Sequence, residues 1–557
     1  MTSALHIPSV LSTVCLSLIP PRHELFTPNY IQKNAADLER RKEGCRTLAC
    51  LARVCKAFTN PTLDVLWRDV PSVDVLLKVL PCLQHDPGIQ HVQYTILDDI
   101  SAVQWDRLQF YAGLIRALHQ AYPLQALSIQ RVVWAVIKQR CCGRPLLPNL
   151  QTLELRHIDI SDPVGLTLLL SPSLRTVVLS FSRANGTMRH RRLQPLIPAS
   201  PIPTHFEALV QLIGSTLPHL TRLQVLNLPG SLPSHCMSYL TRLHQLHRIE
   251  LGIDTAADYH VLQCLSRFPS LRTLSVAVVL REEDREQELD LGPGFLGLEE
   301  LHLNGRAEDL VAVIQVSSFL ALRSLSLEIC TVDSPDAFMD DFAVICSRVP
   351  KSISKIDLAV SMNYGFEPIS LTTLVKPVLS WGAVTVFKVQ TDNYAPILDN
   401  DDLRSFAEAW PHLVDFELRP TNEDNSQGVK HPKVYVTITG LIDLAQRCPR
   451  LRSLTIPALD IAELPDIRDV PPLNRRDLSR LQIKDLMRTD SANLMTVAII
   501  LDLLFPCVST RRSVEAAYVQ RHSYYYMLHI DNRVFDFLLI LMGTIAARRE
   551  CDRISIP

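Results

Sequence analysis

Apolar residues recur in one fixed frame along most of the chain. At Leu150-x-x-Leu153-x-Leu155, three apolar positions are separated by two residues and then by one. Successive side chains of a strand point to opposite faces, so Leu153 and Leu155 would share a buried face. Most copies are 23 to 31 residues apart, which predicts a repeat with one strand in each unit. The copies begin at Leu124, Leu150, Leu174, Leu223, Leu246, Leu271, Leu298, Leu322, Ile353, Val384, Leu413, Leu451 and Leu478.

Six repeats also share a proline two residues before the first apolar position. A true repeat reuses its turn chemistry, so this agreement favours a structural unit over chance in an apolar chain. The prolines are Pro148, Pro172, Pro218, Pro269, Pro411 and Pro449. The Pro218 copy frames Leu220, Leu223 and Val225, three residues before the frame that begins at Leu223. The register near 183–222 is therefore left open.

Helical patterns fill the gaps between the frames. Thr204 and Glu207 have the spacing of a capping box, and 337–348 and 401–410 each end just before a proline. A unit of strand, turn and helix buries its apolar face only by stacking on the next unit. The pattern resembles the leucine-rich-repeat solenoid, which implies an α/β fold with irregular strand–helix repeats over 82–486. Helical segments at 494–505 and 535–549 predict a helical C-terminal cap over 487–557.

The first eighty residues follow a different pattern. Ile7-Pro8 opens a segment with Val10, Leu11, Val14 and Leu18 on one helical face. Leu48-x-x-Leu51-x-x-Val54-Cys55-Lys56-x-Phe58 and then Pro61-x-Leu63-x-x-Leu66-Trp67 come later. This arrangement resembles an F-box, which implies a small all-α module over 1–81. Together with the repeats, the chain is similar to the F-box/leucine-rich-repeat proteins that are common in fungi.

That resemblance implies a substrate-recognition subunit of a Skp–cullin–F-box ubiquitin ligase. The module would bind a Skp-type adaptor, and through it a cullin, by placing apolar helix positions in a groove. The implied adaptor-binding residues are Ile7, Pro8, Leu11, Leu18, Leu51, Val54, Cys55, Phe58, Leu63 and Trp67. The segment 21–46 departs from the family pattern and could displace the first helix from the adaptor surface. This departure favours the alternative, a stand-alone leucine-rich-repeat scaffold without a role in ubiquitin ligation.

Polar residues between the inward-facing apolar positions would form the concave face of the solenoid. Their mixed charge favours a protein partner over a nucleic acid, which would select a basic stripe. The partner is not identified by any residue. The predicted face comprises Glu154, Arg156, Arg248, Glu250, Glu300, His302, Glu328, Lys355, Asp357, Lys388, Asp415, Glu417 and Arg419.

Composition narrows the function further. The chain has 557 residues, of which 47% are hydrophobic, and its 56 basic and 58 acidic residues nearly cancel. This balance gives no whole-chain electrostatic reason for binding a nucleic acid or an anionic membrane. The 14 cysteines form no C-x-x-C pair, which predicts reduced thiols in a cytoplasmic or nuclear protein. The apolar stretch 534–547 is too short to span a bilayer.

No motif for catalysis stands out. Only 18 glycines are present, and the chain lacks a P-loop, an H-E-x-x-H pair and a G-x-S-x-G elbow. The segment 292–297 matches G-x-G-x-x-G, but an acidic run precedes it where a nucleotide site needs a strand. The 18 histidines show no metal-ligand spacing with cysteines or carboxylates. We therefore expect a protein without enzymatic activity, metal or cofactor.

Overall fold

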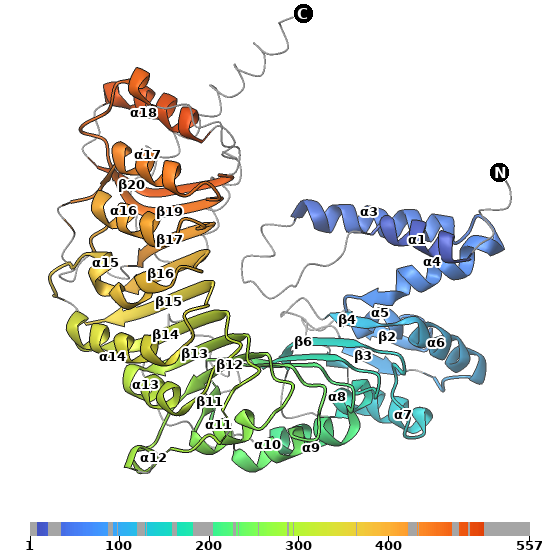
Figure 1. The fold of residues 1–557 in the computed structure, drawn as a ribbon. Coiled ribbons are helices and arrows are strands. Elements are labelled where there is room, and N and C mark those ends of the chain that lie inside the picture. The colour runs from blue at the N-terminus through green and yellow to red at the C-terminus, as the bar shows by residue number, and fades with distance from the viewer. Residues whose placement is uncertain are drawn as a thin grey trace, which may run out of the picture. The chain divides into compact units, whose positions relative to one another are not determined.

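The computed structural model is an α/β chain in which parallel strands alternate with helices, as the repeat pattern predicts (Figure 1). It divides into two compact units: Met1–Arg189 with Leu196–Ala277, and His190–Pro195 with Val278–Pro557. The structure describes residues 8–19, 35–86, 93–96, 98–119, 128–129, 131–158, 164–181, 204–226, 230–231, 233–253, 255–286, 289–292, 294–363, 365–421, 432, 434–470, 478–487 and 491–505.

Three helices at the start of the first unit pack around one small core. They are α1 (Pro8–Ser17), α3 (Ala35–Leu51) and α4 (Lys56–Arg68). Each contributes one buried residue to the core: Cys15, Leu48 and Val65. A Cβ atom on Gly44 of α3 would lie 2.3 Å from the carbonyl oxygen of Leu18, so α3 passes α1 at a distance that only glycine allows. The helix α1 is thus packed directly on α3 and α4, and the second half of segment 21–46 belongs to α3.

In the described part of the first unit, the main sheet includes seven parallel strands that follow one another in the repeat. In spatial order they are β1 (Asp69–Val70), β4 (Ala117–His119), β6 (Thr152–Ile158), β7 (Thr176–Phe181), β8 (Arg222–Leu226), β10 (Arg248–Leu251) and β12 (Thr273–Val278). Equivalent apolar positions lie side by side across these strands, and each is at most 2% exposed. They are Leu118, Leu153, Val177, Leu223, Ile249 and Leu274.

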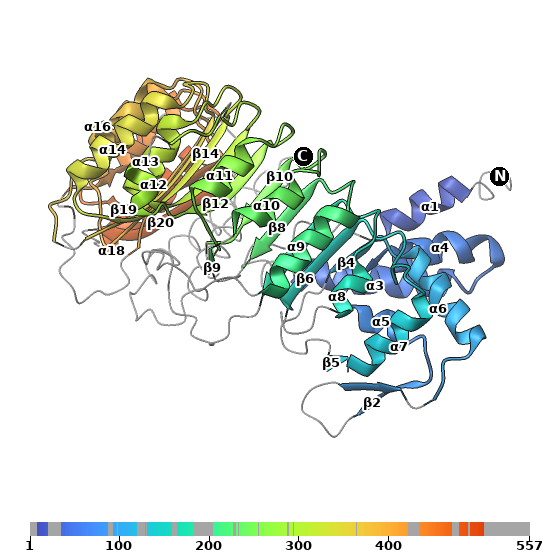
Figure 2. The same cartoon turned by 90° about the horizontal axis from the view of Figure 1, so that it is seen from below.

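Helices cover one side of this sheet (Figures 1 and 2). They include α8 (Val164–Leu169), α9 (Thr204–Thr216), α10 (Ser234–Leu240) and α11 (Tyr259–Ser266). Further elements of this unit are α5 (Val73–Leu77), α6 (Ala102–Leu114) and α7 (Arg131–Cys141), and the short strands β9 (Gly230–Ser231) and β11 (Thr255–Ala257), which pair with each other in the same sheet. The predicted helix at Thr204 is α9.

The structure settles one register and corrects one predicted copy. Leu223 pairs with Val177 and Val225 with Leu179, which matches the frame that follows Pro218 and excludes the frame starting at Leu223. The copy at Leu124 was wrong as a strand of the main sheet. Its last position, Ile129, lies in β5 (Ser128–Ile129), part of a separate sheet with β2 (Leu83–Asp86) and β3 (Gln93–Ile96). An apolar triplet alone does not specify which sheet its strand joins.

The second unit repeats the strand–helix pattern more regularly. Its parallel strands are β13 (Glu300–Arg306), β14 (Ser324–Val332), β15 (Lys355–Met362), β16 (Val386–Asp392), β17 (Asp415–Thr421), β19 (Ser453–Asp460) and β20 (Arg480–Met487). A short strand, β18 (Val436–Thr437), also pairs with β19. The helices are α12 (Glu282–Glu286), α13 (Ala307–Val316), α14 (Pro335–Arg348), α15 (Leu371–Leu374), α16 (Asn400–Ala409), α17 (Ile438–Arg447) and α18 (Ser491–Leu504), with 3-10 turns at Lys376–Ser380 and Ile467–Asp469.

Local sequence explains where the predicted helices begin. Ser334 caps α14 by accepting a hydrogen bond from the Ala337 backbone N–H at 3.1 Å. Asp399 and Asp402 form a reciprocal capping box at the start of α16. These helices correspond to the predicted segments 337–348 and 401–410.

Aromatic residues fill the core of the second unit where the frames depart from leucine. Phe387 and Phe416 occupy equivalent strand positions, and both are fully buried. The ring centroid of Phe387 lies 4.7 Å from that of Trp410, and Phe406 lies 5.5 Å from Phe416. Leu403 of α16 is fully buried as well, so this helix contributes to the same core.

At the C-terminal end, α18 corresponds to the helix predicted at 494–505. The second predicted helix, 535–549, lies outside the described residues, so the capping role of this region stays a prediction. Within the described ranges, no helix is both long enough and apolar enough to cross a membrane.

Replacing Phe416 with alanine tests the shared aromatic core. Removing a fully buried ring should lower the free energy of unfolding by about 3–5 kcal/mol, because transfer energy and packing are both lost. The measurement is chemical denaturation followed by circular dichroism. Leu320→Ala is the control, since Leu320 is 76% exposed and its loss should change stability by less than about 0.5 kcal/mol. Equal effects of the two substitutions would contradict this description of the core.

Candidate functional site

The polar positions of the second unit lie in two neighbouring rows on the strands β13 to β17. One row contains Glu300, Lys355 and Asp415, and the other contains His302, Asp357, Lys388 and Glu417. They alternate with the buried apolar rows, so their side chains point to the face opposite the helix-packed core. Figure 1 shows α13, α14, α16 and α17 together on one side of these strands. We call the opposite side the polar face.

A lysine stands at the centre of an acidic cluster on the polar face. Lys388 Nζ lies 3.0 Å from Asp415 Oδ2 and 3.5 Å from Glu417 Oε2, and Glu417 also pairs with Arg419. Asp357 aligns directly with Lys388 in the sheet. We refer to Lys388, Asp357, Asp415, Glu417 and Arg419 as the Lys388 cluster. It joins three consecutive strands through charge as well as through the backbone.

Burial and charge oppose one another in this cluster. Burial alone would lower the pKa of Lys388, but Glu417, Asp415 and Asp357 outweigh it and hold that pKa above its ordinary value. Burial raises the pKa of Asp357, and repulsion from Glu417 adds to the rise, whereas Lys388 partly offsets it. The lysine is therefore held charged, while burial makes the Asp357 carboxyl group costly to ionise.

The predicted face residues of the second unit differ in their exposure to solvent. Glu300 and Lys355 are exposed, whereas Glu417 is only 8% exposed. The intermediate residues are His302, Glu328, Asp357, Lys388, Asp415 and Arg419. His302 is also engaged, because its Nδ1 lies 2.7 Å from the Ser326 hydroxyl. A partner would therefore reach the outer charges first and the Lys388 cluster only in part.

The predicted face of the first unit is engaged in internal ion pairs. Glu250 pairs with Arg248 of its own strand and lies 3.2 Å from Arg222 Nη2 of the adjacent strand. Glu154 is 8% exposed, and its Oε2 lies 2.7 Å from His119 Nδ1. Arg156 belongs to β6, but its side chain lies outside the described residues. Two of the predicted contact residues here thus stabilise neighbouring strands.

A chain of ionisable side chains that was not predicted connects the helical module to this sheet. Arg41 Nη2 of α3 donates to Asp69 Oδ2 of β1 at 2.6 Å. Asp69 Oδ1 lies 3.6 Å from His119 Nε2 of β4, and His119 continues to Glu154 of β6. Arg41 lies in segment 21–46, which departs from the F-box pattern and carries no motif for this contact. No motif marks Asp69 or His119, since the pairing depends on strand order.

The predicted adaptor-binding residues occupy different environments in the helical module. Leu11 is buried, whereas Val54 and Cys55 are exposed. Leu18, Leu51, Phe58, Leu63 and Trp67 are intermediate. Pro8 begins α1, but Ile7 and the side chain of Pro8 lie outside the described residues. Trp67 packs against Tyr111 of α6, with ring centroids 4.5 Å apart, so it connects α4 to the next helix.

Apolar side chains are exposed on the outer surface of the module. Val10 and Val14 are 41% and 50% exposed on α1, and Val54 is 67% exposed at the corner between α3 and α4. This corner is fixed, because the Thr59 hydroxyl donates to the Ala52 carbonyl oxygen at 3.0 Å. The chain then enters α4 through extended backbone at Cys55. We call Val10, Val14 and Val54 the outer valines.

The glycine-rich segment has the geometry of a turn and not of a nucleotide site. Gly292 and Gly294 have φ values of 66° and 68°, in the left-handed region. The strand β13 follows at Glu300, whereas a dinucleotide site requires a helix to open there.

Comparison with known proteins gives little further information. No family model matches the chain, and no curated protein matches its sequence. Among solved structures, the chain is similar to a chain of the Rad7 and Elc1 complex in yeast, with 13% identity and a TM-score of 0.35. The similarity covers 72% of this chain and 95% of the other. A TM-score of 0.35 is too low to support a conclusion about this chain. The chain is described as an α/β repeat protein because of its own arrangement of parallel strands and helices.

Lys388→Met tests the Lys388 cluster while retaining the length of the side chain. Removing the cation should cost about 1–3 kcal/mol of stability at neutral pH, because it leaves partly buried carboxylates facing each other. The pKa of Asp357 is raised in the folded protein, so this residue contributes favourably to the free energy of unfolding at acid pH, and that contribution is lost as the pH rises through its pKa. The difference in stability between the variant and the wild type should therefore become smaller as the pH falls towards about 4.

The measurement is denaturant unfolding of the wild type and the variant from neutral pH down to about pH 4. Lys351→Met is the control, since Lys351 is exposed just before β15. A deficit that does not change with pH, or that the control reproduces, would contradict the assigned electrostatics.

Asp69→Asn tests the charged connection between α3 and the sheet. The substitution keeps the shape but removes the charge that Arg41 and His119 face, so α3 should be held less tightly and stability should fall by about 1–3 kcal/mol. Hydrogen exchange should accelerate in α3 before it does in β6. Asp106→Asn, at an exposed position on α6, is the control. Unchanged exchange in α3 would show that the connection does not hold this helix.

Proposed function

We propose that this protein is the substrate-recognition subunit of a Skp–cullin–F-box type ubiquitin ligase. In this proposal the helical module binds a Skp-type adaptor, which links it to a cullin, and the repeats bind a target protein. The chain performs no chemistry itself. It holds the target close to a conjugating enzyme, so that transfer is accelerated by proximity.

The observation that carries the proposal is the exposure of apolar side chains on the folded helical module, where Leu16 is exposed as well as the outer valines. The motif Leu51-x-x-Val54-Cys55-Lys56-x-Phe58 spans the corner between α3 and α4, where Val54 and Cys55 point outward. Apolar groups on rigid helices are typical of helix-in-groove recognition. Val14 of α1, on the same three-helix module, adds a further apolar contact for the adaptor.

The packing of α1 also supports adaptor binding. Segment 21–46 would weaken the proposal if it displaced the first helix, but Cys15 of α1 shares a core with Leu48 and Val65. The motifs on α1 and at the α3–α4 corner therefore belong to one folded body. The alternative function, a stand-alone scaffold, would use the same repeats without the adaptor.

The polar face is the proposed site for the target protein. It presents Glu300 and Lys355 as exposed charges of opposite sign, with the partly buried Lys388 cluster beside them. Such a surface discriminates through complementary charge and shape, which favours a folded protein or peptide over a polyanion. The embedded ion pairs keep the surface rigid, which limits the ordering cost of binding.

Substituting two outer valines tests adaptor binding. The double substitution Val14→Asp and Val54→Asp places charges in the proposed apolar contact. Affinity of the full chain for a purified Skp-type adaptor should fall at least about 30-fold, the effect of losing an interface hot spot. The measurement is isothermal titration calorimetry, with circular dichroism to establish the fold.

Val103→Asp is the matched control, because Val103 is 78% exposed on α6 outside the proposed contact. It should bind like the wild type. If the wild type shows no adaptor binding, the ligase function is wrong and the scaffold alternative is favoured. If the double variant binds as tightly as the wild type, the assigned surface is wrong.

A further inference from the structure

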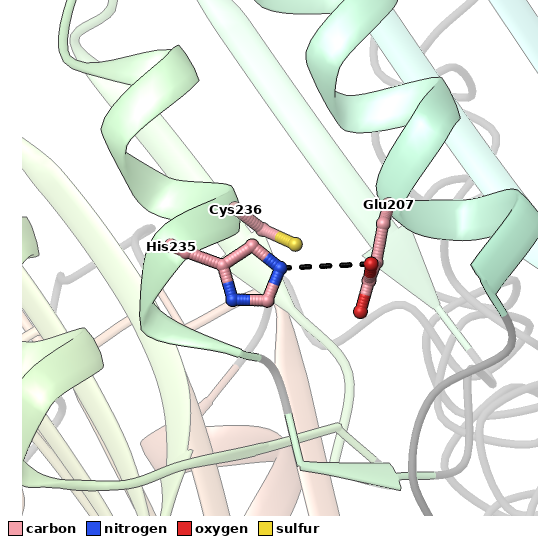
Figure 3. Close-up of side chains that lie close together, drawn as sticks. All are labelled: Glu207, His235 and Cys236. Carbon is pink, nitrogen blue, oxygen red and sulfur yellow. Dashed lines mark ion pairs between the residues drawn. The ribbon is translucent and has the colours of Figure 1, made fainter.

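Three side chains with metal-binding donor atoms meet between two neighbouring helices of the first unit. Glu207 lies in the first turn of α9, and His235 and Cys236 lie in the first turn of α10 (Figure 3). One carboxylate oxygen, one ring nitrogen and the thiol sulfur all lie within 4.8 Å of one another. His235 Nε2 lies 3.6 Å from Glu207 Oε2. Two ligands at tetrahedral zinc are about 3.4 Å apart, so this pair needs little movement.

The helices that carry these residues are held together independently of any ion. A Cβ atom on Gly214 of α9 would lie 2.4 Å from the carbonyl oxygen of Tyr239 in α10, so the two backbones are in close contact. Met237 and Leu240 of α10 pack with Phe206 and Val210 of α9 around a common apolar space. Donor atoms on two rigid, packed helices form a more exact site than donors on loops.

The three donors are a thiol sulfur, a ring nitrogen and a carboxylate oxygen, and they differ in exposure. Cys236 is fully buried, whereas the side chain of His235 is 62% exposed. The site therefore has one buried anchor and one side that is open to solvent.

We propose that Glu207, His235 and Cys236 form a zinc site that links α9 to α10. Sulfur, nitrogen and oxygen donors together suit zinc, which accepts all three, whereas magnesium and calcium prefer oxygen alone. Three protein ligands leave the fourth tetrahedral position for water. The ion would join two consecutive helices of the stack, and so stabilise the first unit.

Binding is balanced by the loss of one proton. The Cys236 S–H bond breaks, its proton passes to solvent, and the sulfur donates an electron pair to zinc. His235 donates an electron pair through Nε2, and Glu207 donates one through a carboxylate oxygen. About one proton should therefore be released per zinc ion bound, and affinity should increase with pH.

The spacing of residues along the sequence does not reveal this site. His235 and Cys236 are adjacent, but Glu207 lies in the preceding helix of the stack, and no short metal motif spans the two. We expected no metal site because the histidines show no metal-ligand spacing with cysteines or carboxylates along the sequence. Only the packing of α9 on α10 brings the third donor into reach.

Cobalt titration of the full chain tests the site, using Co²⁺ as the probe and Zn²⁺ as the competitor. After treatment with a chelator, the wild type should bind one Co²⁺ with a thiolate-to-metal charge-transfer band, and Zn²⁺ should abolish the band. Cys236→Ser should remove the band. His235→Ala should weaken affinity at least about tenfold, and its exposure makes it the variant that keeps its fold. Calorimetry in buffers of different ionisation enthalpy should give the proton release.

Matched controls lie on the next helix. His260→Ala and Cys264→Ser, both on α11, should bind cobalt and zinc like the wild type. Absence of the charge-transfer band in the wild type would overturn the proposal. It would also be overturned if His235→Ala and Cys236→Ser bound Co²⁺ as tightly as the controls, because the metal would then be held elsewhere.

Discussion

Within each unit, the parallel strands of the repeats pair so that equivalent positions of successive repeats lie side by side. Leu301, Leu325 and Ile356 form one such row, and each is buried against the helices. Because side chains alternate along a strand, this apolar register places the intervening residues on the opposite face. A slip of one residue would exchange the two faces. The register therefore determines both the core and the candidate binding surface.

This register also brings ionisable side chains of neighbouring strands together. Strand β16 places Lys388 between the carboxylates of its neighbours, and β4 places His119 between Asp69 and Glu154. Removing one member of such a group leaves another partly buried charge without compensation, which costs more than the intact pair contributes. These groups stabilise and order the sheet. Recognition is then proposed to depend on the more exposed charges at its surface.

Much of this fold could be predicted from the sequence, because burial repeats along the chain. The frames with Pro148 and Pro172 became β6 and β7, and the proline at 218 marked the correct register for β8. Local patterns could not separate the triplet at Leu124 from the others, since strand partners are chosen in three dimensions. The Arg41–Asp69–His119 chain and the Glu207 site depend on packing between distant segments, which spacing does not reveal. On the helical module, the motif indicated Val54, while the contact of Trp67 with Tyr111 required coordinates.

In the proposed function, the helical module binds an adaptor and leaves the repeats available for a target. Hydrogen exchange of the full chain, alone and saturated with a purified Skp-type adaptor, tests this most directly because it locates the contact along the sequence. Adaptor binding by the helical module should give new protection in α1 and at the corner between α3 and α4, with the strands β13 to β17 unchanged. Protection on those strands, or no protection in the helical module, would contradict it.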